Sequence, residues 1–316
     1  DSEFLAVLAD PLEFDANLDP PDLGSALLVG LPDVAASGRS VFPAVSGNGE
    51  VAGYSWLADP TALAASALPA SRSGQVGATL SAFVSMINGG AVVAENCRIA
   101  LATDVPLAFS YQPTDPMTNA VIGVANTPID IAPGSVQTWL VSGEILASFS
   151  PTEVRLRYGC DNSAAVGVIE GVNTVLLSGS ATPVPDMVAL AATPNQNGVL
   201  DIAGVSGAAA FSVASVNVGS AATISVTADT AGVNLPVGLT LCETNTSGAC
   251  INPATPTAGA VTVSVGAAET HSFSVFANGS GSIADNAAVN RIRVVFREAN
   301  GTVRGQTSVA LRTANP

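Results

Sequence analysis

The sequence predicts an all-β chain of two tandem antiparallel β-sandwiches behind an irregular acidic N-terminal segment. Three observations predict this class: an internal repeat of domain size, short period-2 apolar stretches between Gly, Pro, Asn and Asp turns, and no helical period in either repeat unit. The expected segments are the N-terminal segment, 1–67, a first sandwich, 68–186, and a second sandwich, 187–316.

The repeat consists of apolar stretches that occur in the same order in both units. The matched stretches are 83–90 with 212–219, 105–111 with 235–241, 129–131 with 263–265, 154–158 with 292–296, and 175–177 with 309–311. The first pair closes with Asn-x-Gly, which we interpret as a turn that tolerates positive φ. Trp139 and Phe273 occupy equivalent positions after the third pair, so both are expected in the core.

The last strands resemble those of tandem immunoglobulin-like modules in secreted bacterial surface proteins. The stretch that carries this likeness is 297–310, REANGTVRGQTSVA, in which Asn-Gly predicts a hairpin. The resemblance extends over 68–316 and implies sandwiches of the immunoglobulin or fibronectin type outside the cytoplasm. It implies no catalytic or binding residues, since such modules act as spacers, adhesive surfaces or polymer subunits. The two units depart from antibody domains because they share no Cys positions and place no Trp near a Cys.

Composition excludes several classes of function. The chain is 48% hydrophobic, 5% aromatic and only 11% charged, and it contains no Lys. Without Lys there is no Schiff base, no Ser-x-x-Lys nucleophile and no P-loop. No apolar run approaches the roughly 18 residues of a membrane helix, so no membrane insertion is expected. The start at Asp1, without an initiator Met or a leader, favours an exported protein at the cell surface or outside the cell.

The formal charge of −15 is unevenly distributed. Residues 1–67 hold ten acids and one Arg, whereas residues 68–316 hold fifteen acids and nine Arg. This balance repels phosphate backbones, so we expect no nucleic-acid partner. Divalent cations and salty surroundings suit such a chain, because screening shortens the reach of its self-repulsion.

Four Cys predict two disulfides, one within each sandwich. The pair Cys97 and Cys160 would join distant strands of the first sandwich. The pair Cys242 and Cys250 would close the loop 243–249 of the second. A redox or metal cluster would need C-x-x-C spacing, which is absent.

The N-terminal segment aligns with neither unit. It offers a candidate strand at 26–31, another at 50–56, and a short helix after Asp59-Pro60. Its short apolar runs alternate with carboxylates, and it could either lie along its own sandwich or add a strand to the sheet of a neighbouring subunit. The candidate assembly residues are Ala26, Leu27, Leu28, Val29 and Leu31.

Catalytic and metal chemistry find little support. His271 is the only His, and it lies two residues before Phe273, the place of an ordinary strand residue. Asp15, Asn17 and Asp19 begin like a calcium loop, but Pro20 and Ala26 stand where Gly and a bidentate Glu are required. We expect no catalytic residue, no cofactor and no dedicated metal site. Calcium held by N-terminal carboxylates stays open.

The leading hypothesis is therefore a non-enzymatic subunit of a surface filament, matrix fibre or surface layer, whose partner is another copy of itself. The expected strands 121–124 and 261–265 lack the Lys and other charged residues that usually protect exposed sheet edges, so we expect some edges to pair with other chains. The alternative is a monomeric adhesin that binds a surface glycan, for which Tyr54 and Trp56 are the candidate aromatics.

Overall fold

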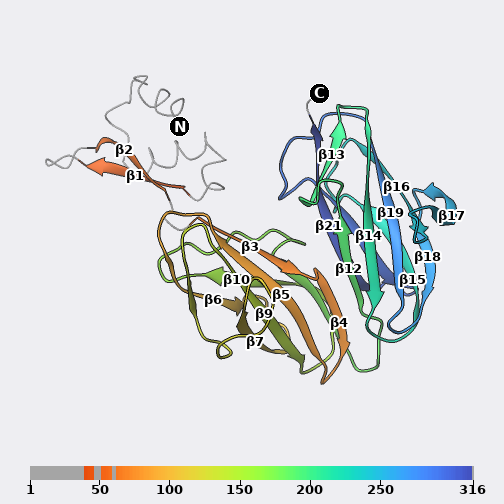
Figure 1. Cartoon of the computed structure of the whole chain (residues 1–316), viewed down its shortest axis with the longest axis horizontal. Coiled ribbons are helices and arrows are strands. Elements are labelled where there is room, and N and C mark those ends of the chain that lie inside the picture. Colours follow the sequence, from red (N-terminus) through yellow and green to blue (C-terminus); the bar gives the residue numbers. More distant parts are fainter. Residues whose placement is uncertain (1–38, 46–50, 59–61, 315–316) are drawn as a thin grey trace. The chain divides into compact units, whose positions relative to one another are not determined.

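The protein is described by a computed structural model for residues 39–45, 51–58 and 62–314, with side chains from Ala62 onward (Figure 1). Its contacts divide the chain into two compact units, Asp1–Ala62 and Leu63–Pro316. The described ranges form strands, turns and bends but no helix, and so no helix that could cross a membrane. The predicted all-β class is confirmed.

In the first unit, the described residues form one antiparallel hairpin of β1 (Arg39–Val45) and β2 (Val51–Ala58). The strand expected at 50–56 corresponds to β2. The strand expected at 26–31 lies outside the described residues.

The second unit begins with a strand where the sequence suggested a helix. Leu63–Leu68 form β3, which pairs with β5 (Thr79–Asn88) over its full length. The helix predicted after Asp59-Pro60 is therefore wrong for these residues, because long-range pairing outweighs local helix-start signals. The first sandwich accordingly includes residues 63–67, which the sequence boundaries placed in the N-terminal segment.

The first sandwich has a four-stranded sheet, β3-β5-β9-β7, and a five-stranded sheet, β4-β11-β10-β6-β8. All pairs are antiparallel except β4 with β11, which is parallel. The remaining strands are β4 (Ser71–Gln75), β6 (Ala94–Leu101), β7 (Leu107–Thr114), β8 (Ile129–Ile131), β9 (Val136–Ile145), β10 (Phe149–Gly159) and β11 (Thr174–Ser180).

The second sandwich has two five-stranded sheets, β12-β14-β19-β16-β17 and β13-β21-β20-β15-β18. Here the parallel pair is β13 with β21. Its strands are β12 (Met187–Ala192), β13 (Val199–Ala203), β14 (Ala208–Asn217), β15 (Ala222–Asp229), β16 (Val237–Thr244), β17 (Cys250–Thr257), β18 (Val261–Val265), β19 (Thr270–Gly279), β20 (Arg291–Glu298) and β21 (Val303–Ala314).

The two sandwiches share one topology, strand for strand, apart from the additional edge strand β17. The orders β3-β5-β9-β7 and β11-β10-β6 correspond to strands A-B-E-D and G-F-C of the immunoglobulin arrangement. The edge strands depart from it. In variable-type domains the strand added beside C precedes D along the chain, whereas β8, which takes that place here, follows β7.

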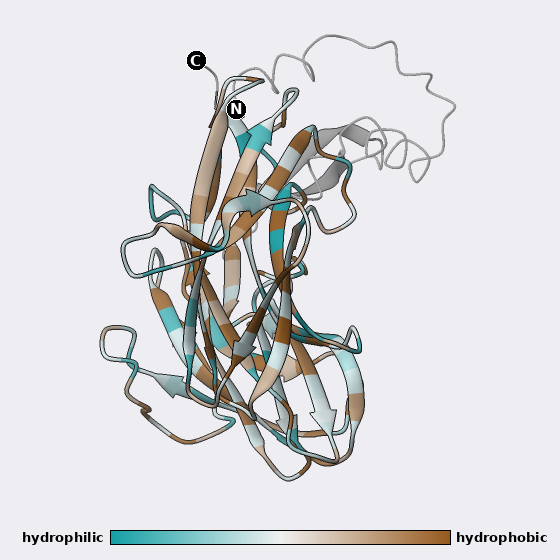
Figure 2. Cartoon of the chain, turned by 90° about the vertical axis from the view of Figure 1, so that its right-hand side faces the viewer, coloured by the Kyte–Doolittle hydropathy of each residue, from teal (hydrophilic) through white to brown (hydrophobic). Residues whose placement is uncertain are grey.

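Each sandwich has its own core between its two sheets. Trp139 and Phe273 are both fully buried at equivalent positions, as predicted, and Phe273 packs edge-on against Phe296. Figure 2 shows apolar and polar residues alternating along the strands, the period that places one set of side chains inside and the other outside.

The Asn-x-Gly turns serve a different purpose from the one inferred from sequence. Neither Asn88 nor Asn217 has a positive φ. Instead both are buried, and each side-chain amide donates to two main-chain carbonyls while its oxygen accepts from the glycine N–H two residues later. Gly219 is required for close approach, since a Cβ there would lie 2.3 Å from the Val184 carbonyl oxygen.

Two disulfides join the pairs inferred from the sequence, Cys97 with Cys160 and Cys242 with Cys250. Cys97 lies on β6 and Cys160 directly follows β10. These strands are distant along the chain, as expected, but they are neighbours in one sheet. The second bond ties β17 to β16. Disulfides persist in oxidising compartments, so these bonds favour a place outside the cytoplasm.

The two bonds are expected to differ in their contribution to stability. Replacing Cys97 and Cys160 with Ala opens a loop of sequence separation 63, against 8 for Cys242 and Cys250. Loop entropy then gives losses of about 4 and about 2.5 kcal/mol in the free energy of unfolding. Urea denaturation of the two double variants measures both. Equal losses would contradict the loop-entropy account.

Polar contacts connect the two sandwiches. At the junction, Asp186 accepts hydrogen bonds from Arg72 Nε at 2.9 Å and from the Ser73 N–H at 2.8 Å. Deeper in, the Gln306 N–H on β21 donates to Ser71 Oγ at 2.7 Å, and Gln306 Nε2 donates to Glu153 Oε2 at 3.0 Å. The second sandwich is thereby held to β4 and β10 of the first.

Glu153 gives this junction a pH dependence. Burial raises the pKa of Glu153, although hydrogen bonds from Thr174 and Gln306 oppose the shift. A carboxyl whose folded-state pKa is raised binds its proton more tightly when folded, so it favours folding at low pH and loses that contribution as pH rises through the raised pKa. Glu153→Gln should therefore raise the thermal midpoint at pH 7 and leave it unchanged near pH 4. Thermal denaturation across this range checks it, and an unchanged midpoint at pH 7 would contradict it.

Candidate functional site

β7 is one of the two edge strands of the sheet β3-β5-β9-β7, so no strand of this sheet pairs with its side away from β9. Tyr111 exchanges hydrogen bonds with Asn126, and the Pro113 carbonyl accepts from the Ile122 N–H, all on the side away from β9. Odd-numbered residues of β7 thus direct their N–H and C=O groups outward. Within the described chain, no strand pairs with Phe109 on that side. The first half of β7, 107–110, is therefore a partly open edge: the Leu107 N–H donates to the Val105 carbonyl at 2.7 Å, whereas the outward groups of Phe109 have no partner strand in the described chain.

The second half of β7 is covered by the loop that follows it. The stretch 121–124, expected as a strand, is instead a turn region in which only Val121 forms a bridge, with Thr114. The strand expectation was wrong because Gly123, with a positive φ, and the hydrogen bond from Gln112 to its carbonyl turn the chain away from extended pairing. The loop thereby covers Tyr111–Thr114 and leaves 107–110 uncovered.

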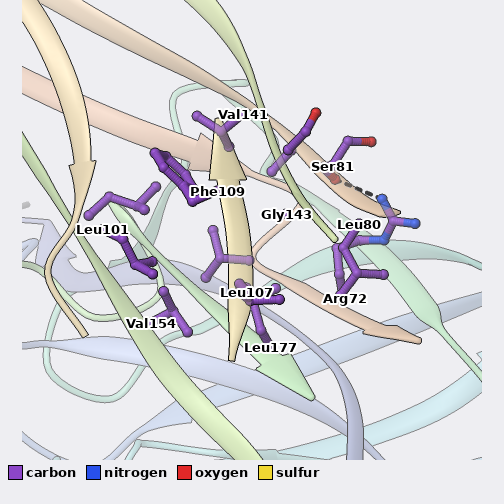
Figure 3. A pocket seen from close by; sticks show the side chains of 14 residues that line it. Arg72, Leu80, Ser81, Leu101, Leu107, Phe109, Val141, Gly143, Val154 and Leu177 are labelled. Atoms are coloured by element: carbon purple, nitrogen blue, oxygen red, sulfur yellow. Dashed lines mark hydrogen bonds between the residues drawn. The ribbon is translucent and has the colours of Figure 1, made fainter. Parts of the chain in front are cut away.

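An apolar cavity of about 30 Å³ lies behind this open half of β7, between the two sheets (Figure 3). Leu107 and Phe109 of β7 and Leu101 at the end of β6 form its half-exposed wall, while its inner wall is buried. Its volume is close to one water molecule's share of the liquid. The cavity is lined almost entirely by Leu, Val, Ala and Phe, with Arg72, Ser81, Ser142 and Gly143 as the other lining residues. It suits a methyl group better than a polar ligand.

The equivalent edge of the second sandwich is better protected. β17 pairs with β16 at Leu241–Thr244, and the disulfide of Cys242 with Cys250 holds it there. On the side of β16 away from β19, only the first half, 237–240, has no partner strand among the described residues. The stretch 261–265 forms the expected strand, β18, which is an edge strand of the other sheet and carries no charged residue.

His271 is a strand residue on β19, with polar contacts at the end of the core. Its Nδ1 lies 2.7 Å from Glu243 Oε1, and its Nε2 lies 3.5 Å from Glu269 Oε1. Ser215 donates its hydroxyl to the His271 main-chain carbonyl and not to the ring. Gln137, at the same place in the first sandwich, also makes a cross-strand hydrogen bond, from its Nε2 to the Thr114 carbonyl on β7. The arrangement holds strands together and presents no nucleophile to the imidazole.

Several sequence-derived candidates fall outside the described part of the chain. These are the assembly residues Ala26, Leu27, Leu28, Val29 and Leu31, the calcium-loop residues Asp15, Asn17 and Asp19, and the side chains of Tyr54 and Trp56. Among the residues that are described, no group of three or more His, Cys, Asp or Glu side chains could hold a metal ion.

The cavity and the open half of β7 were missed by sequence reasoning. A signal existed, because Pro106, the second residue of 105–111, is tolerated mainly at sheet edges. The stretch also contains none of the charged residues that usually protect an exposed edge. Pairing partners, however, cannot be assigned from one strand's sequence.

No family model and no curated protein matches the chain. Among solved structures, it is similar to the secreted serine protease VesC of Vibrio cholerae, with 9% identity, TM-score 0.21 and coverage of 78% of this chain and 52% of VesC. The chain thus spans about half the length of VesC. A protein of unknown function from Porphyromonas gingivalis W83 gives 11% identity, TM-score 0.24 and coverage of 79% and 99%. The major pilin subunit BcpA of Bacillus cereus gives 9% identity, TM-score 0.27 and coverage of 80% and 70%. These TM-scores are all below 0.5, so the likenesses carry no argument about function.

Proposed function

We propose that this protein is a non-enzymatic extracellular structural subunit that assembles with copies of itself by inter-subunit strand addition. The open half of β7, with the apolar cavity behind it, is the acceptor. The donor is the apolar stretch Ala26, Leu27, Leu28, Val29 and Leu31 of a neighbouring copy. The product is a filament, matrix fibre or surface layer outside the cell.

The single observation that supports this function best is that the outward main-chain groups of Phe109, which have no partner strand in the described chain, lie beside an apolar cavity. Strand addition uses main-chain hydrogen bonds for affinity and side-chain pockets for specificity. An added strand would place alternate side chains toward the cavity. Ala, Leu and Val side chains match its apolar wall.

Negative-stain electron microscopy at high salt, with and without calcium, tests the proposal. The full chain should form ordered fibres or sheets, because salt screens the charge of −15. The donor variant Leu27→Asp with Leu28→Asp should remain dispersed. The matched control, Leu5→Asp with Leu8→Asp, adds the same charge elsewhere in the segment and should assemble. Dispersed monomers of the unmodified chain under every condition would refute assembly and favour a monomeric adhesin.

A further inference from the structure

The outer face of the sheet β3-β5-β9-β7 carries two apolar rows that run across its strands. Strand register places Leu68 opposite Phe83 and Phe83 opposite Leu140, which makes the first row. Ile87 stands between Ala64 and Val136 in the second. Leu68, Phe83, Ile87 and Val136 are 53%, 44%, 48% and 43% exposed. We call the two rows together the apolar face.

A row of hydroxyl groups separates the two apolar rows, and its members are already paired with one another. Ser66 Oγ lies 2.7 Å from Ser85 Oγ, and Thr114 Oγ1 donates to Thr138 Oγ1 at 2.7 Å. Polar groups that already have partners lose less when water is removed. The whole face can therefore be dehydrated at small cost.

The same face of the second sandwich shows that the fold does not need these apolar side chains. The positions of Leu68, Phe83 and Leu140 are taken there by Ala192, Ser212 and Ser274, in the same cross-strand register. Both sandwiches have the same topology and a complete core. The second row does keep apolar residues, with Val188 and Val216 at the places of Ala64 and Ile87. The large apolar residues of the first row occur in the first sandwich alone, which points to a contact made by that sandwich alone.

Charge and area indicate what occupies the face. The two apolar rows contain no charged residue. On the rest of the outer face of these four strands the only charged residue is Glu144, opposite Thr79 at the far end, whereas the chain as a whole carries −15. Two copies of so acidic a chain repel least where neither is charged. The four strands lie about 4.8 Å apart and have 6, 10, 10 and 8 residues at about 3.3 Å each, which gives roughly 540 Å² per copy. Pairing would bury roughly 1,100 Å² in total, the size of a weak but specific interface.

We propose that the apolar face packs against the same face of a second copy of this chain. Two such sheets stack face to face about 10 Å apart, with interdigitated side chains, as the two sheets of a sandwich do. Because each copy uses the same face, the interface is two-fold symmetric and gives a dimer that does not grow further. It lies on the face of the sheet and strand addition on its edge, so the two contacts join copies in different directions, and this inference does not depend on the proposed function.

Sedimentation equilibrium of the full chain at high salt tests this contact by itself. The experiment uses the Leu27→Asp, Leu28→Asp chain, in which strand addition is disabled. This chain should associate into dimers, and salt should strengthen the association by screening repulsion. Phe83→Ser and Leu140→Ser, added to this chain, install the serines found at the equivalent positions of the second sandwich. They should raise the dimer dissociation constant at least about tenfold. The thermal midpoint should stay unchanged, because the sister copy folds with these residues.

The matched control is Val205→Ser with Val289→Ser, which removes two apolar side chains of similar exposure outside the face. It should dimerise like the parent. A parent chain that stays monomeric up to its solubility limit would overturn the proposal, and so would a Phe83→Ser, Leu140→Ser variant that dimerises as well as the control. Dimers of the parent in sedimentation, together with dispersed particles of the unmodified chain in the electron microscope, would uphold this contact and refute strand addition.

Discussion

Replacing Asp186 with Ala should lower the free energy of unfolding by about 3 kcal/mol, since it removes one partner of a buried ion pair. Asp186 is almost fully buried, and Arg72 is mostly buried beside it. Burial raises the pKa of Asp186 more than Arg72 lowers it, which shows how little solvent reaches the pair. Without the carboxylate, Arg72 keeps only its bond to the Ser81 carbonyl. Urea denaturation of the full chain measures the loss.

The matched control is Asp161→Ala. Arg98 and Asp161 form a closer pair, at 2.6 Å, but both side chains are about half exposed. Exposed pairs are screened by water and contribute little. The variant should unfold almost like the unmodified chain. If its loss equals that of Asp186→Ala, burial is not what makes the junction pair important.

Trp139→Ala should lower the free energy of unfolding by about 3 to 5 kcal/mol, because it empties the centre of the first core. Trp139 is fully buried on β9, among residues of both sheets. Its indole N–H, however, has no hydrogen-bond partner in the described structure. A buried donor without a partner costs roughly 1 to 3 kcal/mol. Part of the benefit of this large side chain is therefore already lost.

The sister position supplies the conservative variant. Trp139→Phe installs the residue found at Phe273, removes the unpaired N–H and keeps most of the ring, so its loss should be below about 1.5 kcal/mol. The reciprocal Phe273→Trp should destabilise more, because it adds volume and an unpaired donor to a filled core. Thermal denaturation of the three variants gives the order. A Trp139→Phe loss equal to that of Trp139→Ala would show that the N–H does have a partner.

The sequence reveals the architecture because the repeat is present twice. A single period-2 stretch does not name its neighbours. Two ordered copies of the same stretches define the strands of both sandwiches, and the buried positions of Trp139 and Phe273 follow from them.

The features that escaped prediction depend on contacts distant in sequence. β3 and β12 pair with strands that begin many residues later. The local signals at Asp59-Pro60 therefore predicted a helix where β3 forms. β4 is a short Ser- and Gly-rich strand whose only partner is β11, near the end of the sandwich. The apolar face becomes visible only when register places Leu68, Phe83 and Leu140 side by side. Sequence alone gives the alternation of each strand but not the rows across strands.

The parallel pairing of β4 with β11, and of β13 with β21, has a mechanical consequence. Each pair joins a strand near the start of a sandwich to its last strand, with five matched positions in each case. Tension applied through the chain ends of a sandwich pulls such strands past each other lengthwise. All the hydrogen bonds of the pair then bear the load together and must break at once, whereas antiparallel strands pulled apart from one end break them in turn. A chain built this way resists stretching, a property useful to any component that must transmit force between its two ends.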